Sequence, residues 1–414
     1  MLAIVGGKVR TACRDGGAVA PEIDDGVILI EGGRIAAVGG PDLPVPAGCQ
    51  VIDARGGIVT PGLVDAHSHI GIWEDGLGWE GDDTNEGTDP NTADVRALDG
   101  INPADTAFAE ALEGGVTTVQ VMPGSANVIG GEIVTIKCAG SIVDDMVLLR
   151  PSGLKAALGE NPKRHYRAQH KRPSTRMGSA AVLRAALTKG RDYLRKQEAA
   201  AAKGDRAPDA DLKLEMVGRV LRKEIPLRVH AHRADDILTA VRIRDEFGID
   251  ISIEHATEAD RIAPILASKD IPCLVGPIGG PRSKLENKDR GPHTPAALAA
   301  AGVKFGLICD HAVIPQQWLR IGAGLCIREG LSDRRALEAC TRDAAEIIGV
   351  GGRVGTLEPG KDADIVIWDG DPFEYLTRAR CVLVDGRVAH CTCGHPCAEQ
   401  HTGAADKAGR CCGC

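Results

Sequence analysis

The sequence predicts an α/β fold, a (β/α)8 TIM-type barrel with a small β-sandwich domain built from both chain termini. Three observations support this prediction. The chain has 414 residues, which is enough to bury a large core in more than one domain. Short apolar runs alternate with helical segments through its middle, which is typical of a parallel sheet. Its two ends consist instead of short strands and glycine turns.

Both ends of the chain carry hairpin patterns. Residues 27–38 form two apolar runs around a Gly-Gly pair, and residues 380–388 form two runs around an Asp-Gly turn. A β-rich beginning and a β-rich end around a different middle predict one composite β-sandwich domain, made of residues 1–60 and 350–390.

The middle of the chain, residues 61–349, alternates strands with helices that end at glycine. About eight strands can be placed, which is the number that closes a (β/α)8 barrel. The third and fourth strands are placed near residues 133–138 and 152–158. A long charged insertion, residues 162–211, has a strongly helical part at 180–203 and is expected to cap the barrel or to form an interface.

Composition and charge exclude several classes of partner. The net charge of -8, without a basic stripe, argues against a nucleic-acid partner. No apolar run reaches the length of a membrane span, and the apolar start of the chain is too short for a signal peptide. We therefore expect a cytoplasmic protein that binds a small molecule, and we leave open whether it forms a homo-oligomer.

The cysteines fall into two groups. Eight of the 14 are scattered through the body of the chain and are expected to be buried thiols in a reducing compartment. The other six lie in residues 391–414, a segment with almost no large apolar residues, which predicts a disordered Cys-rich tail. A soft-metal or redox-sensitive tail is the alternative, but the C-x-C and C-C spacings are not the usual zinc pattern.

The most informative segment is residues 64–69. An apolar run that begins at Gly57 ends at His67 and His69, and side chains at positions i and i+2 of a strand share a face. Active sites of barrels lie at the carboxyl ends of the strands. Both imidazoles can therefore bind one metal ion there.

Other predicted strands also end in potential metal ligands, namely His230 (or His232), His255 and Asp310. Three or four nitrogen ligands with one carboxylate suit zinc, manganese, nickel or iron. Asp310 can bind the ion and also accept a proton from the attacking water as a general base. The alternative role for Asp310 is the N-cap of a helix.

Two longer motifs carry a family resemblance. Residues 61–69 resemble the first-strand signature of the amidohydrolase superfamily, and residues 355–366 resemble the return of its members to their small sheet domain. The imidazolonepropionase-related branch is the most similar. The resemblance implies a metal-dependent barrel enzyme that hydrolyses amide, ester or related C–N bonds. Its cofactor is expected to be one or two divalent transition-metal ions, with zinc preferred.

The resemblance also implies a carboxylated lysine on the fourth strand that bridges two ions. Lys155 is the preferred candidate, because a lysine at the end of a buried strand is costly unless it is paired or modified. Lys137 is the alternative. Without a bridge, a one-metal site remains, formed by His67, His69, His230 and Asp310. His255 would then hold the water or the substrate oxygen.

The complete set of expected site residues has three parts. Asp310 and His255 are the expected catalytic residues. The expected metal ligands are His67, His69, Lys155, His230, His255 and Asp310. The expected substrate-binding residues are His232, Arg233 and Arg282, of which Arg282 could clamp a substrate carboxylate.

The function expected from these residues is metal-dependent hydrolysis of a small cyclic amide, an N-acyl amino acid or a dipeptide-like substrate. A heterocycle deaminase is the first alternative. It is disfavoured because deaminases that resemble this chain carry a glutamate a few residues after the histidine aligned with His230, where Arg233, Ala234 and Asp235 follow here. A catalytically silent scaffold is the second alternative, and it is disfavoured because the chain keeps a full set of ligands.

Overall fold

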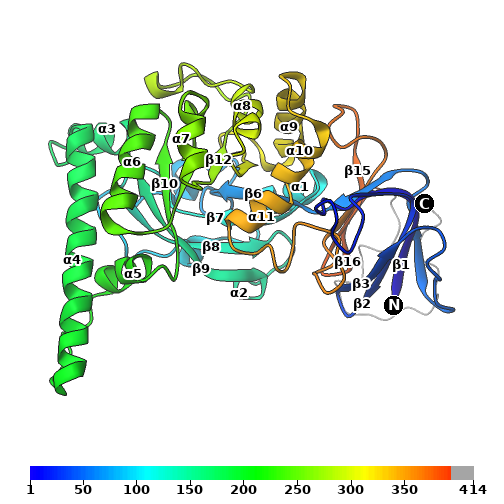
Figure 1. Cartoon of the computed structure of the whole chain (residues 1–414), viewed down its shortest axis with the longest axis horizontal. Helices are drawn as coiled ribbons and strands as arrows, with labels where there is room; N and C mark the ends of the chain where they lie inside the picture. The colour runs from blue at the N-terminus through cyan, green and yellow to red at the C-terminus, as the bar shows by residue number, and fades with distance from the viewer. Residues whose placement is uncertain (393–414) are drawn as a thin grey trace.

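The computed structural model describes residues 1–392, which form two sheets and the helices around one of them (Figure 1). The first and last strands of the chain lie together at one end of the molecule, beside the barrel (Figure 1). The composite domain and the barrel predicted from the sequence are therefore both present. Most of the predicted Cys-rich tail, residues 393–414, lies outside the described residues.

The small domain is one continuous hydrogen-bonded sheet. Its order is β16-β15-β14-β5-β1-β2-β3, with β4 paired to β1. The strands are β1 (Leu2–Arg10), β2 (Glu22–Glu31), β3 (Arg34–Gly39), β4 (Gln50–Asp53), β5 (Ile58–Pro61), β14 (Ile365–Trp368), β15 (Ala379–Val384) and β16 (Arg387–Cys391). Apolar side chains from both ends of this sheet, such as Ile35 and Leu383, share one buried cluster. The two layers that the sequence predicts as a sandwich are thus parts of a single curved sheet.

The barrel sheet has eight strands in chain order. They are β6 (Leu63–Ser68), β7 (Val116–Val121), β8 (Ile129–Lys137), β9 (Val147–Ala157), β10 (Leu227–Ala231), β11 (Ile251–His255), β12 (Cys273–Val275) and β13 (Phe305–Leu307). A bridge between Ser68 and His311 and a hydrogen bond from the His69 amide to the His311 carbonyl connect its two edges. The sheet is therefore nearly closed.

Strand β8 departs from the all-parallel pattern that the sequence predicts. It runs antiparallel to both β7 and β9, whereas the other barrel pairs are parallel. The connections on either side of β8 are short, and the second contains only α2 (Val143–Met146). A parallel connection usually needs a crossover of a dozen or more residues, so these links permit only antiparallel neighbours.

Helices surround the barrel. The remaining α-helices are α1 (Thr106–Glu113), α3 (Glu160–Ala168), α4 (Arg176–Lys203), α5 (Leu212–Leu221), α6 (Ala234–Phe247), α7 (Ala263–Ser268), α8 (Thr294–Ala300), α9 (Leu319–Arg328), α10 (Asp333–Ala339) and α11 (Arg342–Ile347). Short 3-10 helices occupy Gly78–Gly81, Ala97–Gly100, Ala259–Ile262, Leu285–Asn287 and Gln316–Trp318. The predicted insertion, residues 162–211, contains most of α3 and all of α4, and α5 follows it directly. Helix α4 extends past the barrel at the end far from the small domain (Figure 1).

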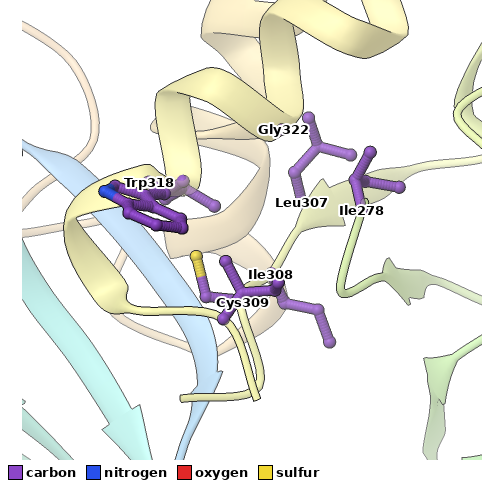
Figure 2. A pocket seen from close by; sticks show the side chains of 8 residues that line it. Ile278, Leu307, Ile308, Cys309, Trp318 and Gly322 are labelled. Carbon is purple, nitrogen blue, oxygen red and sulfur yellow. The ribbon is translucent and has the colours of Figure 1, made fainter. Parts of the chain in front are cut away.

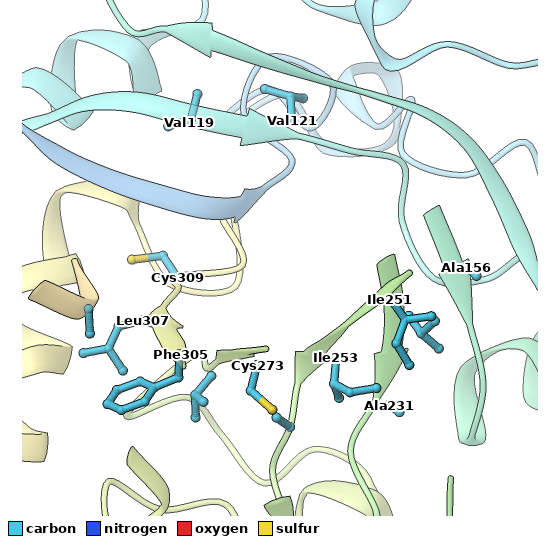
Figure 3. Close-up of a cluster of buried hydrophobic side chains, with 14 of the residues drawn as sticks. Val119, Val121, Ala156, Ala231, Ile251, Ile253, Cys273, Phe305, Leu307 and Cys309 are labelled. Atoms are coloured by element: carbon cyan, nitrogen blue, oxygen red, sulfur yellow. The ribbon is translucent and has the colours of Figure 1, made fainter. Parts of the chain in front are cut away.

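The main hydrophobic core lies between the barrel and its helices. Alternate residues of each strand point outward, and Figure 3 shows Val119, Ile253 and Phe305 among these buried side chains. The residues between them, such as Arg228 and Glu254, are also fully buried but polar. This period-two alternation leaves a polar column inside the barrel and an apolar layer outside it.

Lys137, at the end of β8, connects the barrel to the small domain. Its Nζ lies 2.7 Å from Asp364 Oδ2, 3.1 Å from Asp362 Oδ2 and 3.3 Å from Asp385 Oδ1. Lys137, Asp362 and Asp364 are all buried. Removal of the lysine would leave buried carboxylates without their cation, which is more costly than loss of an exposed ion pair.

We therefore expect Lys137→Ala to lower the free energy of unfolding by about 3–5 kcal/mol in chemical denaturation. Lys8→Ala is the control, because Lys8 pairs with Glu22 on the exposed surface of the small domain. That variant should lose no more than about 1 kcal/mol. Equal losses in the two variants would contradict the assigned role of Lys137.

Candidate metal centre

The barrel brings the predicted metal ligands together at the carboxyl ends of its strands. They come from separate strands or the residues that follow them: His67 and His69 from β6, Lys155 from β9, His230 and His232 from β10, His255 from β11 and Asp310 from β13. The β6 histidines and Asp310 offer ligand atoms within 4.8 Å of one another, and His230, His232 and His255 form a second such group. The His255 ring lies 4.7 Å from that of His67 and 4.3 Å from that of His230, so the groups are adjacent.

Two of these residues, His255 and Asp310, have left-handed backbone conformations that direct their side chains. In β11, Ile251 and Ile253 belong to the outer core, so simple alternation would also place His255 outside. His255 instead has φ of 71°, Ala256 has φ of 47°, and the ring turns toward the other histidines. Asp310 has φ of 54°. Left-handed conformations of residues other than glycine are unfavourable and gather at functional sites.

Most of the histidines are held through Nδ1. His67 Nδ1 donates to Glu254 Oε2 at 2.8 Å, and His69 Nδ1 donates to the Met122 carbonyl at 2.7 Å. His255 Nδ1 lies 3.0 Å from the Gly276 carbonyl, and His232 Nδ1 lies 2.8 Å from the Thr257 hydroxyl. A partner on one ring nitrogen fixes the tautomer and leaves the other nitrogen, here Nε2, for a metal.

Glu254, the hydrogen-bond partner of His67, is the last of three side chains that are hydrogen-bonded in series inside the barrel; we call these three the column. Arg228 Nη1 donates to Ser252 Oγ at 3.1 Å, and Ser252 Oγ donates to Glu254 Oε1 at 2.5 Å. All three side chains are buried. The column therefore fixes Glu254, and Glu254 fixes the His67 ring.

The electrostatics of the site favour neutral imidazoles. Burial lowers the pKa of His230 to about 4 and holds the pKa of His67 and of His255 well below its usual value. The positive charge of Lys155 contributes to the lowered pKa of His67. Neutral imidazole is the form that binds metal ions.

The donor atoms fit a divalent transition metal. His230 Nδ1 and His232 Nε2 are buried without a hydrogen-bond partner in the described structure. His69 Nε2 lies 3.2 Å from Asp310 Oδ1, and His67 Nε2 lies 3.5 Å from the same oxygen. Buried nitrogens that converge with a carboxylate are the ligand set that zinc and related ions prefer. His232, expected to bind substrate, offers its free nitrogen beside the ligand candidates.

Lys155 lies in this centre, and Lys137 does not. Lys155 Nζ is fully buried, 3.2 Å from His67 Nε2 and 3.1 Å from Met122 Sδ. Burial lowers its pKa to about 8, although the charges of Glu254 and Asp310 oppose this shift. Lys137 is instead bound by the carboxylates at the small domain. The structure therefore removes Lys137 as a candidate for the bridging lysine.

A cavity of about 170 Å³ opens above the histidines. Its lining includes His69, Trp73, Asn85, Ser125, Asn161, His230, His232, Lys284, Asn287, Arg290 and Asp310. Arg233 and Arg282, expected to bind substrate, do not line it. Arg233 is engaged by Asp235 at the start of α6, and Arg282 is exposed and donates to the Arg290 carbonyl.

The loop after β12 instead contributes Lys284, Asn287 and Arg290 to the cavity. Arg282, the residue of this loop expected to bind substrate, lies outside the cavity lining, and Arg290 lies within it. The sequence indicates only that this loop lies at the catalytic end of the barrel. It does not indicate which side chain of the loop points into the cavity.

A second pocket lies beside Cys309 and is too small for a substrate. Ile278, Leu307, Ile308 and Trp318 are among its lining residues (Figure 2). Its volume is about 10 Å³, no more than the space for one water molecule. The cavity above the histidines is the candidate substrate site because the expected metal ligands His69, His230 and Asp310 line it.

Comparison with known proteins identifies the family. The model of the amidohydrolase family matches residues 58–390. This chain belongs to the amidohydrolase family. The family and the relatives described below make it a hydrolase of C–N bonds.

Individual relatives of this amidohydrolase span most of its length. The amidohydrolase tasK from Hapsidospora irregularis is 31% identical over 387 residues, which are 87% of this chain but 39% of tasK. An imidazolonepropionase from Rhizobium meliloti is 26% identical, with 86% of this chain and 88% of the relative covered. The crystal structure of an amidohydrolase from Thermotoga maritima MSB8 has a TM-score of 0.90 and 43% identity, with 94% and 100% of the two chains covered.

Within residues 1–392, no helix of this amidohydrolase has both the length and the apolar composition needed to cross a membrane.

The column behind His67 leads to a testable prediction. We expect Glu254→Gln to weaken metal binding by about 10- to 100-fold, because a partner that orients a ligand histidine is typically worth that much. Titration against a chromogenic chelator measures the affinity. Glu132→Gln is the control, since Glu132 is also buried on a barrel strand but pairs with Arg150. Unchanged affinity in Glu254→Gln, with the metal-free protein folded, would show that this contact does not tune the site.

Proposed function

We propose that this amidohydrolase hydrolyses an amide or related C–N bond in a small cyclic amide, an N-acyl amino acid or a dipeptide-like substrate. The observation that carries the proposal is the group of His67, His69 and Asp310 beside the second group of His230, His232 and His255, at the cavity. The proposed metal ligands are His67, His69, Lys155, His230, His255 and Asp310. Zinc as the preferred ion and the cytoplasm as the location remain predictions from the sequence.

The residues of the site suit the attack of water on a carbonyl carbon. A divalent ion held by these ligands would polarise the scissile carbonyl and lower the pKa of the attacking water. Asp310 lines the cavity and is partly exposed there, so its carboxylate can accept a proton from that water. In the one-metal alternative, which lacks the lysine bridge, His255 would not bind the ion and would instead hold the water or the substrate oxygen near Asp310.

Lys155 is the proposed bridging ligand. A fully buried amine with no carboxylate within ion-pair distance among the described residues is unfavourable as a cation. Reaction of the neutral amine with CO₂ forms an N–C bond, releases a proton and turns the side chain into an anion. The carbamate would then supply two oxygens as metal ligands beside His67.

Relatives support a small substrate without fixing its identity. The relative from Rhizobium meliloti is an imidazolonepropionase, which agrees with the small cyclic amide in the proposed set of substrates. A heterocycle deaminase remains the alternative, although no observation at the site favours it.

The proposal is tested by removal and return of the metal. We expect chelation to abolish hydrolysis in a panel of cyclic amides, N-acyl amino acids, dipeptides and amino-heterocycles, and zinc or manganese to restore it. Release of ammonia from the heterocycles alone would establish the deaminase. Full activity of rigorously metal-free protein would overturn the proposal.

We expect Asp310→Asn to fold normally and to lose about 10²–10⁴-fold in kcat, the usual contribution of a general base, because asparagine cannot accept the proton. Asp236→Asn is the control, since Asp236 is buried at the same end of the barrel but bonds Arg176. A near-normal rate in Asp310→Asn would assign the base to another residue, with His255 as the first to test.

We expect Lys155→Ala to bind about half the metal of the wild type, because the ligand shared by two ions is lost. Lys155→Glu should recover part of it by supplying carboxylate oxygens. Lys137→Ala should keep the metal content of its folded fraction unchanged. Elemental analysis of purified protein measures all three, and full metal content with full activity in Lys155→Ala would eliminate the bridge.

A further inference from the structure

Two cationic side chains lie in the cavity above the histidines. Lys284 and Arg290 both line it, and both come from the loop after β12. Asp310 is the carboxylate that lines the same cavity. The cavity therefore combines the candidate reaction centre with a cationic wall.

Lys284 is already neutralised within the protein. Its Nζ lies 3.3 Å from Glu286 Oε1 and donates to Asn161 Oδ1 at 2.9 Å. Glu286 is buried and also accepts the Glu160 amide proton at 2.8 Å. Lys284 and Glu286 thus form a fixed pair behind the histidines, and this pair leaves no net charge for a ligand.

Arg290 has no such partner. Its Nη1 donates to the Pro281 carbonyl at 3.2 Å, while its Nε is buried without a hydrogen-bond partner. In the described part of the chain, no carboxylate oxygen lies within 4.0 Å of its guanidinium nitrogens. A guanidinium has five N–H donors, and a buried charge is normally paired. Arg290 is therefore the cationic residue lining the described cavity that has no ion pair with a carboxylate, although Asp310 and Glu286 act on its charge from beyond that distance.

The loop also holds the main chain of Arg290 through two hydrogen bonds that do not involve its guanidinium. The Arg290 amide donates to the Asn287 carbonyl at 3.1 Å, and Arg282 Nη2 donates to the Arg290 carbonyl at 3.3 Å. Asn287 also lines the cavity, and its Oδ1 is buried without a partner. The wall thus presents a free donor edge and a free acceptor that suit a carboxylate and an N–H group.

We propose that Arg290 binds a carboxylate of the substrate, so that the enzyme acts on anionic small molecules such as N-acyl amino acids, dipeptides or acidic cyclic amides. The inference rests on the proposed function and narrows its substrate class. Arginine suits this role because its planar donors bind carboxylates bidentately. The bound carboxylate then directs the neighbouring amide toward Asp310 and the histidines.

The test uses metal-loaded enzyme and matched pairs of substrates. The pairs are N-acetyl amino acids, dipeptides and 5-oxoproline, each beside the carboxamide that lacks the negative charge. We expect Arg290→Gln to lower kcat/KM at least 100-fold for the carboxylates, mainly through KM, and less than 3-fold for the carboxamides. Arg290→Lys should recover part of the loss, because it restores the charge without the bidentate geometry. Lys288→Ala, an exposed residue of the same loop paired with Asp289, should match the wild type.

Equilibrium dialysis of the same pairs separates this inference from the proposed function. The wild type could bind the carboxylates but hydrolyse none of the panel, with binding lost in Arg290→Gln. That result would support the carboxylate-binding role of Arg290 and overturn the hydrolase proposal. Hydrolysis of both members of a pair with equal kcat/KM, unaffected by Arg290→Gln, would overturn the inference and leave the hydrolase intact. No preferential binding of any carboxylate by wild type would also overturn the inference.

Discussion

The carboxylate of Asp65 holds the first and last strands of the barrel together. One oxygen accepts the amide proton of His67, and the other accepts from the Cys309 amide and from Gln316 Nε2. The sheet itself contributes few hydrogen bonds between these two edges, where β6 and the segment after β13 share a bridge at Ser68. Because His67 and Asp310 adjoin these contacts on either side, the same carboxylate sets the separation between a proposed ligand and the proposed base.

This arrangement has a cost. Asp65 is fully buried, and burial raises its pKa to about 7, although the hydrogen bonds from His67 and Cys309 oppose the shift. The interior column from Arg228 to Glu254 is similarly polar. Well-packed apolar residues are often at least as stabilising as buried charged groups, so the polar interior is best explained as the support that the histidines require.

The sequence was most informative where chemistry depends on strand ends. His67, His69, His230, His255 and Asp310 could be grouped because parallel strands present their carboxyl ends at one rim. The direction of β8 was not predictable from its apolar pattern, since that pattern is the same in either direction. The choice between Lys155 and Lys137 depended on where two similar strands end. Arg290 was not predicted at the cavity because its position depends on how the loop after β12 folds back. Those details are set by tertiary contacts, which composition and periodicity do not encode.

The composite sheet has a consequence for biosynthesis. Strand β5 pairs with β14, and these neighbours are separated in the sequence by the whole barrel. During translation, the first strands leave the ribosome long before their partners exist, and domains generally fold from the N-terminus as they emerge. In this chain the small domain, which contains the first strands, cannot be completed before the barrel. The barrel can therefore assemble while β5 still exposes an unpaired edge. The nascent chain therefore carries an open strand edge until β14 is made, a period in which such edges are prone to aggregate.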